Sequence, residues 1–264
     1  MNAGLLAIVR PVSDAMQRCE LTHLDRAPID VALARRQHAE YVATLARLGC
    51  TVHELPPAHH LPDAVFVEDT AVVLDEVAVL TRPGATSRRQ EVPAMSAALA
   101  RWRSCVAIEA PGTLDGGDVL RVGRTLYVGG TPRSSAEGAA QLAAAVAPHG
   151  YRVEVVPVRG CLHLKSAVTL VAPDTLLVNP DWVDPAHWPT LRRIDVDPGE
   201  PQAANALEIG GRVVMPASFP RTQARLSSAG LEVVPVDASE VQKAEGGVTC
   251  CSVLLRVAQA AFQQ

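Results

Sequence analysis

The chain has 264 residues, 48% of them hydrophobic but only 3% aromatic, and a formal net charge of −4 at pH 7. Its core must therefore consist mainly of Ala, Val and Leu side chains, and the net negative charge argues against a general nucleic-acid binder, which needs a basic surface. No apolar run is long enough to span a membrane, and no positive residue precedes the short apolar stretch near the N-terminus. We therefore expect a cytoplasmic protein without membrane contact.

The predicted elements begin with a strand, a helix and a second strand. An apolar segment at 5–10 (LLAIVR) is followed by a segment at 29–49 with apolar residues at helical spacing, and then by a strand-like segment at 50–57. The last strand-like segment, VTCCSVLLRV at 248–257, can pair with the first strand. We therefore expect the two ends of the chain to share one structural unit.

Four stretches between these ends follow one plan, in which a polar entry precedes an apolar strand, a tight turn and a second apolar strand. Helix-like segments follow at 87–103 and 134–150, with a shorter one at 221–230, and third strands follow at 105–111, 151–158 and 231–237. The four stretches are VEDTAVVL-DE-VAVLTRPG (67–84), DGGDVLRV-GR-TLYVGG (115–130), KSAVTLV-APD-TLLVNP (165–180) and ANALEI-GG-RVVMPA (204–217).

The polar entries recur along the chain about every 40 to 50 residues, which is a period typical of repeat architectures. Any single entry is equally well explained as a turn residue before a strand, but five together favour a common design. We therefore predict an α/β fold of about five ββαβ units in a ring, forming a single domain over 1–264, with the strand starts converging on one central place. The entry positions are Asp69, Asp118, Ser166, Asn205 and Ser252.

Two adjacent cysteines lie in the last predicted strand. Successive side chains of a strand point to opposite faces, so Cys250 and Cys251 cannot both face one site. We expect one to carry chemistry and the other to pack, and a shift of register by one residue would exchange them. None of the six cysteines forms a CxxC pair, so a zinc knuckle has no support, and a cytosolic chain of this size favours free thiols.

The chemistry-bearing residues near the entries combine a thiol, an imidazole and several carboxylates, as a nucleophilic site with an anionic pocket requires. Carboxylates beside a thiol would raise its pKa while the site is empty, so they make sense if the substrate brings a cation. A guanidinium fits, because its planar N–H groups pair with carboxylate oxygens. The candidates are Phe66, Glu68, Asp69, Asp115, Asp118, His163, Lys165, Ser166, Asn205, Thr249, Cys250 and Ser252.

Five motifs in order, LPDAVFVEDTAVV, LTRPGATSRRQEV, LDGGDVL, LHLKS and GGVTCCSVL, together resemble the dimethylarginine dimethylaminohydrolases of the guanidino-modifying (pentein) superfamily. The resemblance runs from about residue 8 to residue 257. It implies a five-fold pseudosymmetric α/β propeller, which agrees with the ring inferred from the repeats.

The resemblance also implies a role for each matching residue. Cys250 matches the nucleophile, with Cys251 as its packing neighbour, His163 matches the general acid and base, and Asp115 matches the acid that orients His163. Glu68 and Asp69 would hold the guanidinium. The other matching positions are Asp63 at the amino-acid end of the substrate, Arg88 and Arg133 at its carboxylate, and Leu21 near the lid leucine of the family.

The implied reaction is hydrolysis of methylated arginine to citrulline through a covalent cysteine intermediate, with no cofactor. A Cys–His pair can also bind zinc, so adventitious zinc at Cys250 and His163 is compatible with the absence of a metal role. The alternatives left open are an arginine deiminase or amidinotransferase, a hydrolase of another guanidino or amidino compound, and a non-catalytic guanidino-binding protein on the same fold.

Overall fold

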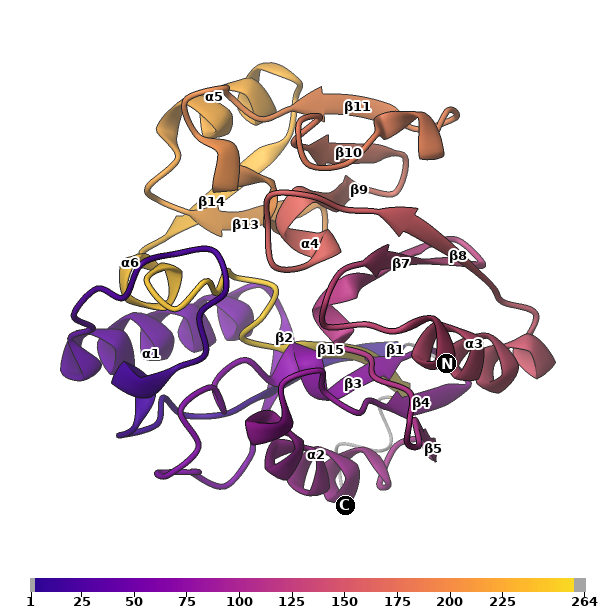
Figure 1. Ribbon diagram of the computed structural model, residues 1–264. Coiled ribbons are helices and arrows are strands. Elements are labelled where there is room, and N and C mark those ends of the chain that lie inside the picture. Colours follow the sequence, from indigo (N-terminus) through magenta and orange to yellow (C-terminus); the bar gives the residue numbers. More distant parts are fainter. Residues whose placement is uncertain (1–2, 259–264) are drawn as a thin grey trace.

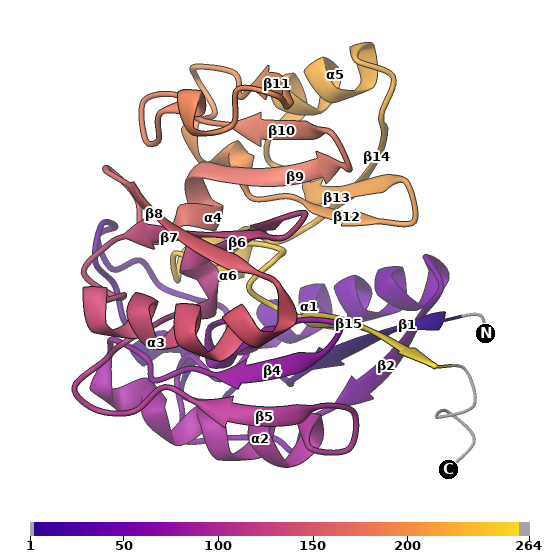
Figure 2. The same cartoon turned by 90° about the vertical axis from the view of Figure 1, so that its right-hand side faces the viewer.

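Five three-stranded sheets, each built on the same plan, form the architecture of residues 3–258, which are the residues that the computed structural model describes. In every sheet the middle strand pairs antiparallel with one neighbour and parallel with the other. The helices α1, α2, α3 and α5 lie at the periphery, and the five sheets surround a common centre (Figures 1 and 2). This confirms the predicted five-unit α/β ring.

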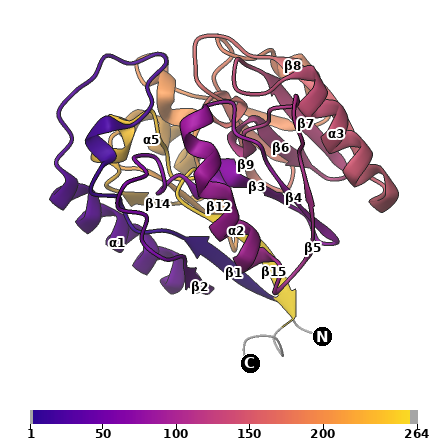
Figure 3. The ribbon, with the colours of Figure 1, turned by 60° about the horizontal axis from the view of Figure 1, so that its bottom comes forward.

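The first unit joins the two ends of the chain, as expected from the sequence. The strand β1 (Ala3–Val9) lies between β15 (Val253–Ala258), to which it is antiparallel, and β2 (Cys50–Glu54), to which it is parallel (Figure 3). The helix α1 (Val31–Arg47) connects β1 to β2, and the Asp30 side chain caps it by accepting a hydrogen bond from the N–H of Leu33.

The remaining units follow in chain order. The second contains β3 (Ala71–Val73), β4 (Val77–Leu80), α2 (Val92–Leu99) and β5 (Ser104–Ala107), and the third contains β6 (Val119–Val122), β7 (Thr125–Gly130), α3 (Ala136–Val146) and β8 (Arg152–Pro157). The fourth contains β9 (Val168–Ala172), β10 (Thr175–Val178) and β11 (Arg192–Asp195), and the fifth contains β12 (Leu207–Ile209), β13 (Arg212–Pro216), α5 (Pro220–Ser228) and β14 (Glu232–Val236).

The short helical segments complete the description. The α-helices α4 (Leu164–Ala167) and α6 (Ser239–Gln242) are one turn long. The 3₁₀-helices are Met16–Arg18, Val67–Thr70, Thr86–Glu91, Gly116–Asp118, Ala147–His149, Pro185–His187 and Pro201–Ala204. No helix in the described part of the chain is both long and apolar enough to cross a bilayer.

The hairpin between β12 and β13 shows why local sequence fixes these turns. Gly210 and Gly211 have φ values of 59° and 84°. Both values lie in the left-handed region, which a two-residue hairpin turn demands and which glycine adopts without steric cost. The Gly-Gly pair therefore sets the register of Leu207 opposite Val214.

The fourth unit departs from the plan, because no α-helix connects β10 to β11. A 3₁₀-helix at Pro185–His187 takes its place, and Pro180, Pro185 and Pro189 lie in this connection. Proline lacks the N–H group that a helix interior needs, so this segment cannot form several helical turns. The strand β11 that follows was not predicted from the sequence.

The hydrophobic core lies between neighbouring units rather than within each one. Leu6 and Val257 of the first unit pack in one cluster with Ala78 and Met95 of the second, and each of these four side chains is at least nine-tenths buried. Each sheet therefore depends on its neighbours for burial, and the sheets are held in fixed positions around the centre. The predicted domain limits 1–264 include residues 1–2 and 259–264, which lie outside the described residues.

Candidate active site

A short helical or turn segment precedes the first strand of each unit, and these segments meet at the centre of the ring. They are residues 67–70 before β3, 116–118 before β6, α4 before β9, 201–204 before β12 and the turn 248–251 before β15. The first of these segments contacts the second, and α4 contacts both 116–118 and 201–204. The predicted convergence of the polar entries therefore occurs through these turns.

The two cysteines lie in a turn, and the prediction of a strand starting at 248 was wrong. The strand β15 begins at Val253, so the alternation of side chains along a strand does not separate the thiols. The turn separates them instead. Cys250 lines the cavity that also contains His163 and Asp69, whereas Cys251 lines a different, apolar cavity beside Tyr41.

Cys250 is buried, and its Sγ accepts a hydrogen bond from the N–H of Gly247 at 3.3 Å. Burial, and after it the negative charges of Glu68 and Asp69, raise the pKa of this thiol to about 12, while Lys165 acts in the opposite direction. The empty site therefore holds a neutral thiol. A cation that pairs with the carboxylates would favour the thiolate.

His163 contacts two carboxylates from different units. Its Nε2 lies 3.0 Å from Oδ2 of Asp115, and its Nδ1 lies 3.9 Å from Oδ1 of Asp69. Burial by itself lowers the pKa of this imidazole, but Asp69, Asp115 and Asp118 outweigh it and raise the pKa to about 9. His163 is consequently a cation at neutral pH and can donate a proton to a group in the cavity.

Asp115 is fully buried and is held from both sides. Its Oδ1 accepts from the N–H of Gly84 at 2.9 Å, and its Oδ2 contacts His163. Gly84 has no room for a side chain, because a Cβ there would lie 2.5 Å from the carbonyl oxygen of Arg133. The arrangement fixes the carboxylate that orients the imidazole.

Asp118 supports the same histidine through the backbone. It accepts hydrogen bonds from the hydroxyls of Thr131 and Ser134, each at 2.6 Å, and from the N–H of Leu164 at 3.0 Å. Burial raises the pKa of Asp118 to about 6, although His163 and the hydroxyls lower it. Because Leu164 follows His163 directly, this contact positions the turn that carries the imidazole.

Asp69 lies at the base of the cavity in a buried ion-pair network. Arg88 donates to Oδ2 of Asp69 at 2.5 Å and to both oxygens of Glu91, and the N–H of Gly117 donates to Oδ1 of Asp69 at 2.9 Å. Burial alone would raise the pKa of Asp69, but His163 and Arg88 hold it at about 2. Asp69 therefore remains an anion.

Arg88 and Arg133 both line this cavity, but their donors are engaged differently. Arg88 also donates to the carbonyl of Phe66 at 2.9 Å, so most of its N–H groups are already used. Arg133 donates to the Thr22 hydroxyl at 3.1 Å, and its Nη1 lies 3.9 Å from Asp115. Of the two, Arg133 has more N–H groups free of ion-pair partners.

Glu68 and Asp69 are adjacent in sequence but do not line the same cavity. Glu68 accepts from Nζ of Lys165 at 2.5 Å and from the hydroxyl of Thr249 at 2.7 Å, and it lines a second cavity of about 210 Å³ on the β3 and β6 side. Asn205 in turn donates to Thr249 at 2.9 Å. Four of the predicted candidate residues thus form one hydrogen-bonded network next to Cys250: Glu68, Lys165, Thr249 and Asn205.

The remaining two entry residues lie away from Cys250. Ser166 lines a separate cavity that also contains Trp182, and Ser252 is hydrogen-bonded to the hydroxyl of Tyr41 at 2.8 Å. Asp69, Asp115 and His163 place ligand atoms within 4.8 Å of one another, so these three could hold a cation. Zinc at Cys250 and His163 stays a prediction.

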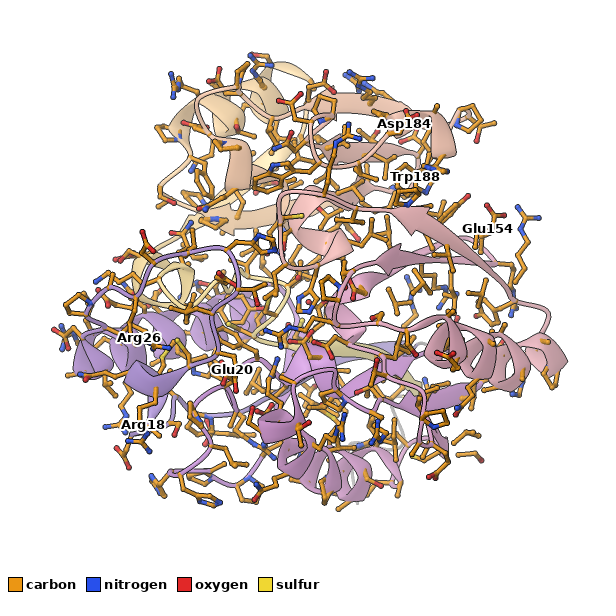
Figure 4. All side chains as sticks on the ribbon, in the orientation of Figure 1. Arg18, Glu20, Arg26, Glu154, Asp184 and Trp188 are labelled. Carbon is orange, nitrogen blue, oxygen red and sulfur yellow. The ribbon has the colours of Figure 1, made fainter. Side chains whose placement is uncertain are left out.

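A loop near the N-terminus covers the cavity. The carboxylate of Asp63 accepts from the N–H of Glu20 at 3.2 Å, and burial raises the pKa of Asp63 to about 6 although Arg88 lowers it. Leu21 follows and is half-buried. Figure 4 shows Glu20 on the central side of this loop, with Arg18 and Arg26 farther out. The cavity that remains is about 20 Å³, room for about one water molecule.

Several residues of this site were not found from the sequence. Glu91 lies three positions after Arg88, which is a helical spacing that could have suggested the pair. Thr131 and Ser134 lie 13 and 16 positions after their partner Asp118 in the same unit, whereas Glu245 lies more than 220 positions from the loop that it binds. No local pattern connects these residues to their partners. The walls of the cavity are Glu20, Asp63, Phe66, Asp69, Arg88, Arg133, Leu162, His163, Ala244, Glu245, Gly246 and Cys250.

Comparisons with known proteins agree with this geometry. The family model described as arginine deiminase matches residues 57–209, more than half of the chain. An N(G),N(G)-dimethylarginine dimethylaminohydrolase of Streptomyces coelicolor is 44% identical over 253 residues, which cover 95% of this chain and 96% of that protein.

Solved structures show the same fold. The Pseudomonas aeruginosa enzyme, as a cysteine-to-serine mutant complexed with citrulline, superimposes with a TM-score of 0.92 at 34% identity, over 96% of this chain and 100% of that one. A histidine-to-glycine variant of a dimethylarginine dimethylaminohydrolase, solved as an adduct with S-methyl-L-thiocitrulline, gives a TM-score of 0.89 at 34% identity, over 94% of this chain and 98% of that one.

Proposed function

This chain belongs to the dimethylarginine dimethylaminohydrolase family, and from that membership and its site we propose that it hydrolyses Nω-methylated arginines to citrulline and dimethylamine or methylamine. One observation carries the proposal: Cys250 faces a buried cavity whose other walls include His163 and Asp69. A nucleophile, a proton donor and an anion for the guanidinium therefore meet at one point.

Substrate binding activates the nucleophile. The guanidinium of the substrate pairs with Asp69, whose low pKa keeps it charged, and the positive charge then lies beside the Cys250 thiol. Because His163 is already protonated, the Cys250 proton passes to solvent water, and the thiolate that remains is the attacking species. The substrate thus adds a positive charge directly beside the Cys250 thiol.

The first chemical step forms a carbon–sulfur bond and breaks a carbon–nitrogen bond. The Cys250 thiolate attacks the central guanidinium carbon, and His163 donates its proton to the departing dimethylamine or methylamine. A covalent thiouronium on Cys250 is left. His163, now neutral, takes a proton from water, the resulting hydroxide attacks the same carbon, and the carbon–sulfur bond breaks to release citrulline.

Other residues position these groups. Asp115 orients the imidazole of His163 and Asp118 holds the adjacent backbone, so both act through the histidine. We propose that Glu68 also acts indirectly and does not bind the substrate, because Lys165 and Thr249 already donate hydrogen bonds to its two oxygens. Its charge acts on the Cys250 thiol through space.

The amino-acid end of the substrate needs an anion and a cation, and the covering side of the cavity supplies both. We propose that Asp63 binds the ammonium group and that Arg133 binds the carboxylate, with Arg88 holding Asp69 and offering its remaining N–H. Phe66 lines the cavity, and Leu21 lies in the loop that covers it. The position of Arg133 beside the loop of Thr22 supports this assignment.

Unmethylated arginine is the second candidate substrate, because the matching family model is described as arginine deiminase. The same residues would then release ammonia instead of dimethylamine. We favour the methylated substrate, because the relative that covers 95% of this chain is a dimethylarginine dimethylaminohydrolase.

A trapping experiment tests the covalent step. The protein is mixed with asymmetric dimethylarginine, quenched in acid and measured by intact mass spectrometry, and the modified peptide is sequenced. We expect an adduct on Cys250 with the mass of the substrate less dimethylamine in the wild type and none in Cys250→Ser. An adduct on Cys251 would contradict the proposed mechanism. So would the absence of a Cys250 adduct in a protein that turns over the substrate.

We also propose a cytoplasmic location. All six cysteines are free thiols, as expected where the medium is reducing.

A further inference from the structure

The carboxylate of Glu245, which has no role in the proposed reaction steps, accepts hydrogen bonds from three consecutive backbone N–H groups of the loop that covers the cavity. The Oε1 of Glu245 accepts from Thr22 at 3.0 Å, from His23 at 2.5 Å and from Leu24 at 2.5 Å. Consecutive N–H groups directed at one anion form a compact binding site for negative charge. The two partners are more than 220 positions apart in sequence, so the contact is purely tertiary.

The backbone at Glu245 is in an unfavourable conformation for its residue type. Its φ is 58°, and among the described residues it is the one non-glycine residue with positive φ. Glycine is the default at such positions, and the next two residues are glycines. The presence of glutamate at this position indicates that its side chain has a role, because strained residues of this kind cluster at functional sites.

Glu245 also belongs to the segment that carries the nucleophile. A Cβ at Gly246 would lie 2.2 Å from the ring of Phe66, so the segment is pressed against the cavity wall. The next residue, Gly247, donates its N–H to Sγ of Cys250. The carboxylate that holds the loop and the backbone that holds the thiol are thus two residues apart.

Two other anchors of the loop are groups that the substrate needs, and a third is the Ser87 hydroxyl, which donates to the Glu20 carboxylate. Asp63 binds the N–H of Glu20, and Arg133 binds the hydroxyl of Thr22. When a substrate occupies the cavity, its ammonium and carboxylate compete for these two side chains. Glu245 does not have to release the loop to bind the substrate, and it is the anchor that holds residues 22–24.

The loop must open for a substrate to enter. The cavity of about 20 Å³ holds about one water molecule, and Glu245, Leu162 and Gly246 line both it and a neighbouring cavity of about 150 Å³ that His23 and Leu24 also line. Detaching residues 22–24 from Glu245 would join the two cavities.

We propose that Glu245 is the latch of this loop: a positioning residue that holds residues 22–24 over the bound methylated arginine and releases them for substrate entry and product exit. The kinetic part of this inference rests on the proposed function, whereas the structural part does not. Because the three bonds form in the closed state alone, the latch stabilises the closed complex rather than the chemical step.

The test uses Glu245→Gly and a matched control. Glycine removes the carboxylate and also relieves the positive φ, so the fold is not expected to lose stability. The control is Glu200→Gln, because Glu200 also caps backbone N–H groups, those of Arg221 and Thr222, at the start of α5. Hydrogen exchange of amides 22–24, the melting temperature, kcat and KM are measured for both variants.

We expect Glu245→Gly to speed exchange of amides 22–24 at least tenfold and to raise KM for asymmetric dimethylarginine about tenfold, with kcat within about threefold and an unchanged melting temperature. Glu200→Gln should lower the melting temperature and leave exchange at 22–24 and KM unchanged. Unchanged exchange in Glu245→Gly would overturn the latch. If exchange is faster in Glu245→Gly but the wild type is inactive on every guanidino substrate, the latch is supported and the proposed function is rejected.

Discussion

The Nε2 of His163 lies 3.0 Å from Oδ2 of Asp115, and both side chains are buried. The two residues come from different units of the ring, 48 positions apart. The contact makes one nitrogen of the imidazole a donor to Asp115 and leaves the other directed toward the anionic side of the cavity. It is the relationship on which the assignment of His163 as proton donor depends.

Asp115→Asn should therefore impair the chemical step more than binding. The amide removes a charge that raises the pKa of His163, and it fits the imidazolium less well as a partner. We expect kcat to fall about 10²–10⁴-fold with a smaller change in KM. The decline of kcat/KM on the alkaline side, near pH 9 for the wild type, should move to lower pH. If kcat/KM of Asp115→Asn declines at the same alkaline pH as that of the wild type, a group other than His163 donates the proton.

The two adjacent cysteines should respond differently to the same substitution. Cys250→Ser removes the nucleophile and should abolish turnover, whereas Cys251→Ser places a hydroxyl in an apolar cavity and should cost about 1–3 kcal/mol of unfolding free energy with activity retained. Citrulline release and urea denaturation of both variants measure this. The opposite pattern would show that Cys251 faces the substrate.

The Cys250 thiol should become more reactive when a guanidinium binds. Its pKa of about 12 in the empty site, raised by burial and then by the carboxylates, predicts slow alkylation by iodoacetamide at pH 7. Methylguanidinium should speed alkylation, and tetramethylammonium, a cation without N–H donors, is the control.

The matched variant for this experiment is Asp69→Asn. Without the anion the guanidinium has no partner, so methylguanidinium should no longer change the alkylation rate. A ligand-independent rate in the wild type would mean that the substrate does not activate the thiol.

Stability should fall in mild acid because of His38, which lies outside the active site. Burial lowers the pKa of His38 to about 4, and its Nε2 has no hydrogen-bond partner among residues 3–258. The unfolded chain binds a proton near pH 6.5 and the folded chain does not, so stability is lost as the pH falls from 6.5 toward 4. We expect this histidine to account for about 2 kcal/mol between pH 7 and pH 5.

The measurement is urea denaturation of the wild type and of His38→Gln at the two pH values. The difference between the proteins isolates His38, because other groups, including His163 with its raised pKa, titrate in both. An equal loss of stability in the two proteins would assign the acid sensitivity elsewhere.

The ring was predictable from the sequence because each unit repeats a local signal. Strand, turn and strand recur with Gly or Asp at the turns, and the last strand lacks a partner unless it pairs with the first. The fourth unit was incomplete in the prediction, because its prolines replace the helix that marks the other units and β11 gave no separate signal.

The position of the site was predictable but the direction of its side chains was not. Glu68 and Asp69 are neighbours in one 3₁₀ turn, and that turn directs Glu68 to Lys165 and Asp69 to Arg88. The family resemblance assigned the role of nucleophile to Cys250, which lines the cavity of His163, whereas the strand alternation that was expected to separate the two cysteines does not apply in this turn. Side-chain direction in a turn depends on φ and ψ of a few residues, which sequence periodicity does not encode.

Contacts between units were the least accessible to prediction. Glu245 binds a loop more than 220 residues away, and Asp118 of the third unit binds the N–H of Leu164 in the fourth. Such contacts follow from the closure of the ring, and no spacing along the chain marks them.

The most direct test of the account is citrulline release from the purified protein, with asymmetric dimethylarginine, monomethylarginine and arginine measured side by side. We predict turnover of both methylated substrates, little on arginine, and none in Cys250→Ser. Turnover of arginine alone would make the protein a deiminase, and absence of turnover on all three, with Cys250 still alkylated by iodoacetamide, would contradict the proposed substrate class.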